Sequence, residues 1–295
     1  MTRQDPRRGV LLMVAAVACF AIQDGFARHL ATEYNTLMVV MVRYWVFAAF
    51  VIILALRHPD GLRTAIRSRR PLAHLARGTL LVTEICLIVW GYTLIGLIES
   101  QAVFAVCPLF VVALSGPVLG ERIGWARWCA VAVGMLGVVV ILRPGAGVFT
   151  WPALLPLVSA LMFATFSVLT RLTTRDEPTF PAFFWPPVIG AVLMTGFGLS
   201  NWEPMAARDV PLLAGYAMMG VVSHWLLLKC YATTEAVRVQ PYAYLQIVFV
   251  SIVGMAVYNE TLHPAVALGT AVVVAAGLFT LMQDRSRTDA DRIVT

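Results

Sequence analysis

Charged side chains are scarce in this sequence. Asp, Glu, Lys and Arg make up 13% of its 295 residues, whereas a soluble domain of this size carries about 25%. No connection between the apolar runs is long enough to hold a second domain. The scarcity of charge argues against a soluble enzyme, a nucleic-acid-binding protein and a disordered scaffold.

Sequence patterns for covalent or metal chemistry are missing as well. None of the five cysteines forms a CxxC pair, and all lie in or at the ends of apolar runs, so neither a disulfide framework nor a zinc site is indicated. No HExxH, GxSxG, phosphate-binding loop or paired-aspartate protease pattern is present. We expect no metal, no cofactor and no enzymatic activity. The thiols expected to be reduced and packed are those of Cys19, Cys86, Cys107, Cys129 and Cys230.

Apolar residues, in contrast, fill most of the chain. They account for 60% of the residues and give a mean hydropathy of +0.81. A membrane-spanning helix needs about 20 mostly apolar residues and must satisfy its own backbone hydrogen bonds. The sequence therefore predicts an all-α integral membrane protein with ten transmembrane helices, the first being an uncleaved helix rather than a signal peptide. The ten segments are Gly9–Leu30, Leu37–Leu56, Arg77–Ile95, Ser100–Leu119, Ala126–Leu142, Trp151–Arg171, Ala182–Leu199, Val210–Tyr231, Ala236–Tyr258 and Ala265–Met282.

Basic residues are distributed unequally between the two sides of these segments. With the N-terminus inside, eighteen Lys and Arg residues fall on the inner side, and three, Arg28, Arg143 and Arg208, fall on the outer side. Such a bias is what the positive-inside rule describes. We therefore expect both termini in the cytoplasm and the protein in a bacterial inner membrane.

The two halves of the chain resemble each other weakly. Three sets of matching residues occur in the same order in both halves. Because each half holds five spans, the second half must be inverted relative to the first, as in many secondary transporters. We expect one membrane domain of two inverted five-helix repeats, residues 1–147 and 148–295. The matching residues are Phe20, Ala21 and Arg28 with Phe163, Ala164 and Arg171; Gly120-Glu121 with Asn259-Glu260; and Gly137 with Gly277.

A short pattern accompanies the end of the fourth span. Pro108 stands thirteen residues before the acid of Gly120-Glu121-Arg122. With ten spans in two blocks, the chain resembles the EamA-type branch of the drug/metabolite transporter superfamily, and within it most closely the bacterial aromatic amino-acid exporters of the YddG type. The resemblance implies export of amino acids through a cavity between the repeats. The second half departs from the pattern at Ile247 and Asn259, and Pro241 is expected to kink the ninth span.

Ionisable side chains inside the predicted spans are costly unless they are paired or hydrated, so each needs a function or a partner. Asp24, beside Gln23, is a candidate ligand for a substrate ammonium or a proton-coupling carboxylate. Pairing with Arg28, one turn along the helix, is the structural alternative. Glu84 is a candidate for coupling or gating, against a helix-pairing role. For Arg43 we favour a structural role, snorkelling toward the headgroups, over contact with a substrate carboxylate.

Polar and aromatic residues of other spans complete the candidate site, with helix packing as the alternative for each. His224 suits substrate contact, gating or proton transfer, and Gln246 shares a helix face with Tyr242. Trp90 is a better cavity candidate than Tyr92, which we place in the interfacial belt. Substrate contacts are therefore expected from Asp24, Gln23, Trp90, Phe163, His224, Tyr242 and Gln246, and coupling or gating from Asp24, Glu84 and His224.

These features favour a secondary transporter that exports amino acids, aromatic ones included, and similar small metabolites by alternating access. A multidrug exporter of lipophilic cations, with Asp24 as the counter-ion, is the alternative within the same fold. A non-transporting membrane sensor is the alternative from another class, although a sensor should carry an extramembrane output domain. The expected partners are a small-molecule substrate, the lipid bilayer and, if transport is coupled, protons. Nucleic acid is not expected as a partner.

Overall fold

Helices account for the regular structure in the described part of the chain. The computed structural model describes residues 6–59, 61–120, 124–142, 151–174, 178–233, 239 and 242–294. Within these ranges eight helical stretches are long and apolar enough to cross a membrane, and two shorter apolar helices, Leu245–Tyr258 and Pro264–Thr280, accompany them. Apolar runs form helices because a chain in hydrocarbon must satisfy its own backbone hydrogen bonds.

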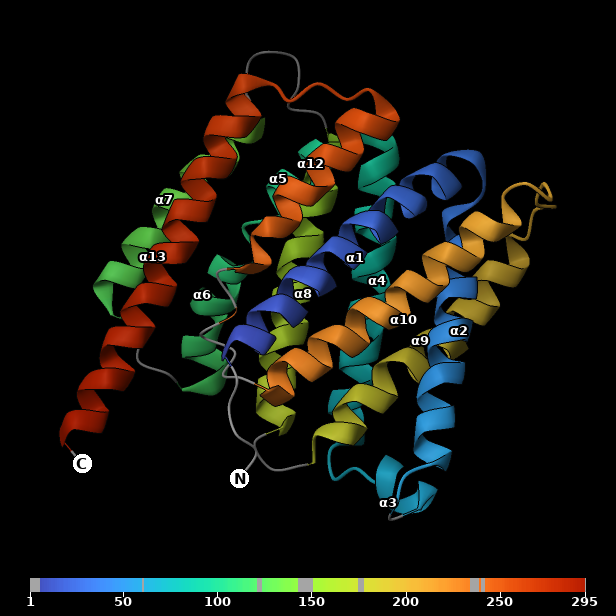
Figure 1. Cartoon of the computed structure of the whole chain (residues 1–295), viewed down its shortest axis with the longest axis horizontal. Coiled ribbons are helices and arrows are strands. Elements are labelled where there is room, and N and C mark those ends of the chain that lie inside the picture. The colour runs from blue at the N-terminus through green and yellow to red at the C-terminus, as the bar shows by residue number, and fades with distance from the viewer. Residues whose placement is uncertain are drawn as a thin grey trace.

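The helices follow one another closely along the chain (Figure 1). The predicted third span begins earlier than expected and the tenth ends later, and α3 lies in an Arg-rich stretch where no helix is predicted. The first elements are α1 (Pro6–Glu33), α2 (Thr36–Leu56), α3 (Leu62–Ile66), α4 (Pro71–Ile95), α5 (Leu97–Phe104), α6 (Cys107–Leu119) and α7 (Trp125–Leu142). The later elements are η1 (Trp151–Ala153), α8 (Leu154–Thr174), α9 (Thr179–Ser200), α10 (Val210–Thr233), α12 (Leu245–Tyr258) and α13 (Pro264–Val294).

The predicted fourth span, Ser100–Leu119, is not one continuous helix. It consists of α5 and α6, which are separated at Ala105 and Val106. Pro108 occupies the first turn of α6, where its missing N–H and fixed φ are tolerated, whereas in a continuous helix it would remove a backbone hydrogen bond. The break therefore follows from the proline. The Pro241 that is predicted to kink the ninth span lies outside the described residues.

The helices that end the fourth and ninth predicted spans stop in the same backbone conformation. Gly120 follows α6 with φ 71°, and Asn259 follows α12 with φ 52°. Asn259 is the non-glycine residue with positive φ in the described part of the chain. Asparagine is the residue that most often replaces glycine in such left-handed helix caps. The Asn259 that departs from the sequence pattern thus preserves the geometry of Gly120, while Glu121 and Arg122 lie outside the described residues.

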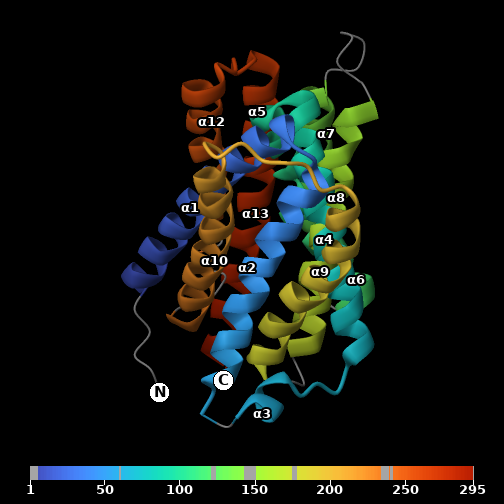
Figure 2. The same ribbon diagram turned by 90° about the vertical axis from the view of Figure 1, so that its right-hand side faces the viewer.

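Helices of the first half of the chain (α1 to α7) pack against helices of the second half (α8 to α13) rather than forming a separate bundle. α1 lies along α10 and α12, and α4 lies along α8 and α9. α2 packs on α9 and α10, while α5 and α6 contact α8. The start of α1 and the end of α13 lie at the same end of the molecule (Figures 1 and 2). This interleaving brings side chains from both parts of the chain into a common core.

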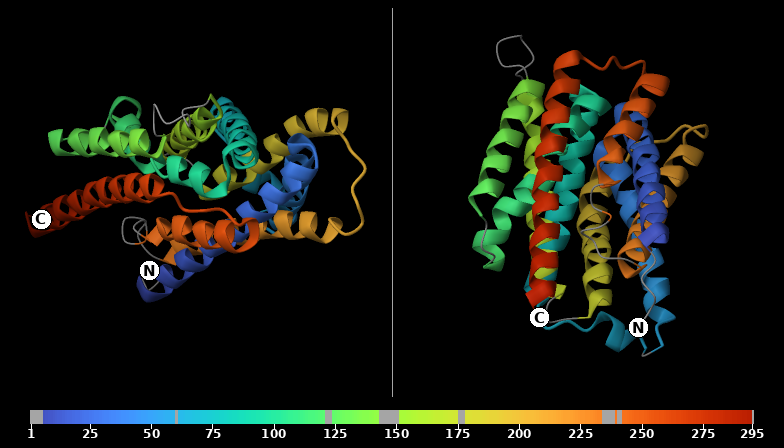
Figure 3. Two further views of the ribbon diagram at one scale, coloured as in Figure 1. Left: turned by 90° about the horizontal axis from the view of Figure 1, so that it is seen from above. Right: turned by 60° about the vertical axis from the view of Figure 1, so that its left-hand side comes forward.

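α7 and α13 form a close pair at one side of the molecule (Figures 1 and 3). A Cβ atom on Gly137 would lie 2.8 Å from the backbone oxygen of Gly269. A real Cβ is essentially never found so close to another heavy atom, so the contact requires glycine. Small residues at a helix crossing let two backbones approach closely in a membrane.

The left-handed conformation at Asn259 predicts opposite effects for two substitutions. Asn259→Gly should leave the melting temperature in detergent at or above that of the wild type. Asn259→Val should lower it, because an ordinary L-residue in this conformation costs about 1–2 kcal/mol. Val257→Ala, at an exposed helical position of α12, is the control and should change little. Equal melting temperatures for Asn259→Val and the wild type would contradict the prediction.

Candidate functional site

Asp24 is the centre of a buried polar cluster. It lies on α1, and its Oδ2 accepts hydrogen bonds from Gln101 Nε2 on α5 at 2.9 Å and from Gln246 Nε2 on α12 at 3.1 Å. The Gln101 amide also donates to the Tyr92 hydroxyl oxygen on α4, at 2.5 Å. Four helices from both parts of the chain therefore meet at one carboxylate. The alternative pairing with Arg28 is wrong, because Arg28 forms an ion pair with Glu260.

Glu84 forms a second buried carboxylate site on α4. The hydroxyl of Ser159 on α8 donates to Glu84 Oε1 at 2.9 Å and lies 3.2 Å from the Glu84 backbone oxygen. Ser159 is fully buried and Glu84 is 4% exposed. The carboxylate thus links α4 to α8 by a buried hydrogen bond.

Arg43 on α2 is buried as well. Its guanidinium carbon lies 5.9 Å from the ring centre of Tyr44 and 5.7 Å from that of Tyr216 on α10. Both distances are within the range of a cation–π interaction. The expectation that Arg43 snorkels to the headgroups is therefore wrong, since the side chain points into the protein and is 5% exposed.

The predicted polar residues are only partly brought together. Asp24 and Gln246 are in direct contact, and Gln23 is buried beside Asp24. His224 does not bind Asp24: its Nδ1 lies 2.8 Å from the backbone oxygen of Gly220. Its ring packs at 5.1 Å from Phe20 and 4.9 Å from Phe47, centre to centre.

The predicted aromatic residues occupy separate environments. Phe163 packs near Phe104 and Phe166, with ring centres 5.8 Å and 5.7 Å away. Trp90 and Tyr242 are each 39% exposed. Among the described residues, no aromatic contact joins either of them to Phe163.

Two residues of the cluster are not predicted from the sequence. Tyr92 is assigned to the interfacial belt, but it is 2% exposed and binds Gln101. Gln101 stands next to Ser100, where the predicted fourth span begins, and it is not among the candidate residues. A glutamine only seven residues before Pro108 is the signal that places it near a helix break inside the membrane.

One end of the cluster's helices is tied together by Glu260. Its two carboxylate oxygens accept the backbone N–H groups of Leu97 at 2.7 Å and Ile98 at 2.8 Å. They thus cap the start of α5, where a negative charge is favourable. Glu260 also forms an ion pair with Arg28, whose guanidinium lies 4.2 Å from the ring centre of Tyr258. The contact joins α1, α5 and the end of α12.

The same end also joins α1 to α10. The Tyr34 hydroxyl donates to Asp209 Oδ2 at 2.6 Å, and His29 Nε2 lies 3.3 Å from Asp209 Oδ1. The hydrogen bond from Tyr34 is the main reason why the pKa of Asp209 lies below its usual value, and it raises the pKa of Tyr34. Asp209 is therefore held as a carboxylate just before α10 begins.

Arg77 makes the corresponding connection at the opposite end, where α3 lies (Figure 1). Its Nε donates to Thr170 Oγ1 on α8 at 3.0 Å, and its Nη2 donates to the backbone oxygen of Ala182 on α9 at 2.9 Å. Arg77 is 1% exposed. This residue, counted from the sequence among the inner-side basic residues, is thus an internal link between α4, α8 and α9.

Comparison with known proteins extends over nearly the whole chain. Residues 7–143 and 150–282 each match the profile of the EamA-like transporter family. The chain is 24% identical to the S-adenosylmethionine uptake transporter of Rickettsia prowazekii (strain Madrid E), over 94% of this chain and 93% of that protein. It is 27% identical to the riboflavin transporter of Vibrio cholerae, over 98% of each chain. A crystal structure of a protein at 16% identity matches with a TM-score of 0.65 over 94% of this chain and 97% of the other, which shows a shared fold.

The Ser159–Glu84 contact predicts a specific loss of stability. Ser159→Ala should lower the free energy of unfolding by about 1–3 kcal/mol, because it leaves a buried carboxylate oxygen without its donor. Ser200→Ala is the matched control, since Ser200 is exposed and its hydroxyl bonds only to its own helix and to Asn201. Thermal melting in detergent should separate the two variants. In the double variant Glu84→Ala/Ser159→Ala the two losses should not add; full additivity would show that the contact contributes nothing.

Proposed function

Because the chain belongs to the EamA-like transporter family, we propose that it is a secondary transporter that carries an amino acid or an amino-acid derivative across the membrane by alternating access. The observation that carries the proposal is the carboxylate of Asp24, which is held by Gln101 from the first half and Gln246 from the second. A buried carboxylate at the meeting of two halves suits a substrate ammonium, and its surroundings change whenever the halves move.

Two observations support an architecture of two repeats, residues 1–147 and 148–295, with ten crossings. The family profile matches the chain twice, once in each half. In two repeats, α1 would correspond to α8, α2 to α9, α4 to α10 and α7 to α13. The contact of α1 with α10 then corresponds to that of α8 with α4, and the contact of α2 with α10 corresponds to that of α9 with α4. The contacts of α2 with α9 and of α7 with α13 each join two corresponding helices, so exchange of the halves leaves them unchanged. The ten crossings count α5 and α6 as one.

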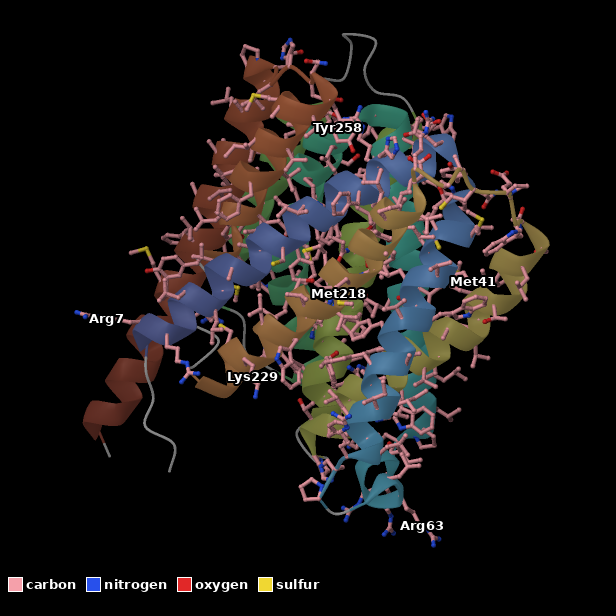
Figure 4. All side chains as sticks on the ribbon, turned by 45° about the vertical axis from the view of Figure 1, so that its right-hand side comes forward. Arg7, Met41, Arg63, Met218, Lys229 and Tyr258 are labelled. Carbon is pink, nitrogen blue, oxygen red and sulfur yellow. The ribbon has the colours of Figure 1, made fainter. Side chains whose placement is uncertain are left out.

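The orientation is proposed from the exposed basic residues. Arg7, Arg63 and Lys229 lie toward one end of the molecule, and Tyr258 lies toward the other (Figure 4). The positive-inside rule assigns the end with these basic residues to the cytoplasm. In this orientation both termini are cytoplasmic, and the contacts of Glu260 close the outer end.

The substrate class is proposed from the site and from the names of the relatives together. S-adenosylmethionine, named for one relative, is itself an α-amino acid with an ammonium, a carboxylate and a planar aromatic base. Asp24 and Glu84 can balance the ammonium, while Trp90, Phe163 and Tyr242 are the proposed contacts of the aromatic part. Coupling or gating is assigned to Asp24, Glu84 and His224. Export is the proposed direction, and aromatic amino acids remain the first candidates.

Alternating access assigns a role to the Glu260 contacts. For the site to open at that end, α1 must separate from α12, or both must move away from α5. Either movement breaks the ion pair with Arg28 or the bonds to Leu97 and Ile98. The contact is therefore proposed to hold that end closed in one of the two states.

Counterflow uptake into proteoliposomes tests the proposed function. Labelled phenylalanine and labelled S-adenosylmethionine should each exchange against an internal pool, and amino acids should compete. Riboflavin and a lipophilic phosphonium cation are the comparison ligands. Competition by the cation alone would favour a multidrug exporter. Absence of counterflow for every one of these ligands, by protein that melts cooperatively, would contradict the proposal and favour a sensor.

Asp24→Asn tests the residue that carries the proposal. Counterflow at low substrate concentration should fall by about tenfold or more, because a hydrogen bond to a charged group contributes about 1.5–3 kcal/mol. Asp209→Asn is the matched control, a buried carboxylate at the end of the helices that should leave the substrate affinity unchanged. Wild-type flux with wild-type pH dependence in Asp24→Asn would remove Asp24 from the mechanism.

A further inference from the structure

Buried polar atoms without a hydrogen-bond partner gather around Arg43. Within the described residues, seven buried side-chain nitrogen or oxygen atoms lack such a partner. Four of them are Arg43 Nε, Gln23 Oε1 and the hydroxyl oxygens of Tyr44 and Tyr216. Each unsatisfied group costs free energy in a low-dielectric interior. A concentration of four at one place therefore calls for a function.

These side chains share one location. The rings of Tyr44 and Tyr216 lie on the Arg43 guanidinium, at 5.9 Å and 5.7 Å from its central carbon. A Cβ atom on Gly220 would lie 3.0 Å from Gln23 Oε1 and 3.2 Å from Arg43 Nε. Both of these atoms thus face the same glycine of α10. A larger residue at that position would press on both.

The charges near Arg43 are already engaged with other partners. Asp24 and Glu84 attract the guanidinium electrostatically. However, Asp24 accepts its hydrogen bonds from Gln101 and Gln246, and Glu84 accepts from Ser159. Among the described residues no carboxylate forms an ion pair with Arg43. Among the described residues, the Nε–H of the guanidinium, which is 5% exposed, therefore has no acceptor.

We propose that Arg43, with the hydroxyl groups of Tyr44 and Tyr216, binds the carboxylate of the substrate. The planar guanidinium donates in the fork geometry that a carboxylate accepts. Gln23 Oε1, beside Asp24 on α1, then accepts from the neighbouring ammonium. The ammonium and the carboxylate of an α-amino acid are bonded to the same carbon atom. Adjacent subsites, one for each group, therefore match α-amino acids. This assignment rests on the proposed function and deepens it by selecting zwitterions over amines.

The rival interpretation is that Arg43 only compensates the charges of Asp24 and Glu84. In that case its removal would weaken binding of every ligand by the same factor. A carboxylate subsite makes a different prediction, because its removal affects only ligands that have a carboxylate. The ratio of two affinities therefore separates the two roles.

The experiment measures equilibrium binding to the purified protein by calorimetry, for two matched pairs of ligands. One pair is phenylalanine and phenethylamine, and the other is S-adenosylmethionine and its decarboxylated form. In the wild type the carboxylated member of each pair should bind at least about tenfold more tightly. Arg43→Gln and Arg43→Lys should reduce this preference to about threefold or less by weakening the carboxylated ligand alone. Tyr216→Phe should give an intermediate loss.

Arg57→Gln is the control, an exposed arginine at the end of the same helix that should keep the preference. Equal binding of both members of each pair to the wild type would overturn the proposal. A preserved preference in Arg43→Lys and Tyr216→Phe would also overturn it, even if Arg43→Gln does not fold. Failure of the proposed function is a separate result: it would be loss of counterflow in proteoliposomes by protein that still binds and discriminates these ligands.

Discussion

The structure depends on holding three ionisable side chains in its buried interior. Asp24, Glu84 and Arg43 lie on α1, α4 and α2, and each is at most 8% exposed. A charge at such a depth costs about 2.5–3.5 kcal/mol or more unless partners compensate it. The partners come from α5, α8, α10 and α12, which include helices of both halves. The polar cluster therefore constrains how the two halves can pack, since a displaced helix would leave a buried charge unmatched.

The sequence predicts the helices better than the contacts between them. Long apolar runs identify the helices because hydrocarbon requires internal backbone bonds, and this part is confirmed for the described residues. The break before Pro108 follows from one residue type, but its consequence for Gln101 requires knowing where the helix stops. The partner of Arg28 cannot be found locally, because Glu260 is distant in sequence and the nearer Asp24 satisfies the usual helical spacing. Whether the Arg43 side chain points into the protein depends on which face of α2 packs against α10. Neither the hydropathy of α2 nor the residues next to Arg43 determine that face.

Matching positions in the two halves of the chain are used in different ways. When Phe20 is matched to Phe163, Ser167 corresponds to Asp24. Its hydroxyl donates a hydrogen bond to the Phe163 backbone oxygen of its own helix at 2.8 Å. It therefore needs no partner from another helix, whereas Asp24 recruits two amides. Asn259 and Gly120 show the reverse case, in which different residues produce the same helix end. Side chains at matching positions can thus diverge while a helix end keeps its backbone conformation.

The glycine contact between α7 and α13 has a consequence for traffic within the bilayer. With Gly137 and Gly269 touching through their backbones, no acyl chain fits between the two helices at that level. A lipophilic molecule dissolved in the membrane therefore cannot enter the protein laterally between α7 and α13 at this level. A molecule in the bilayer can approach the buried cluster only between other helices, since this pair of helices is closed to it at the level of the two glycines.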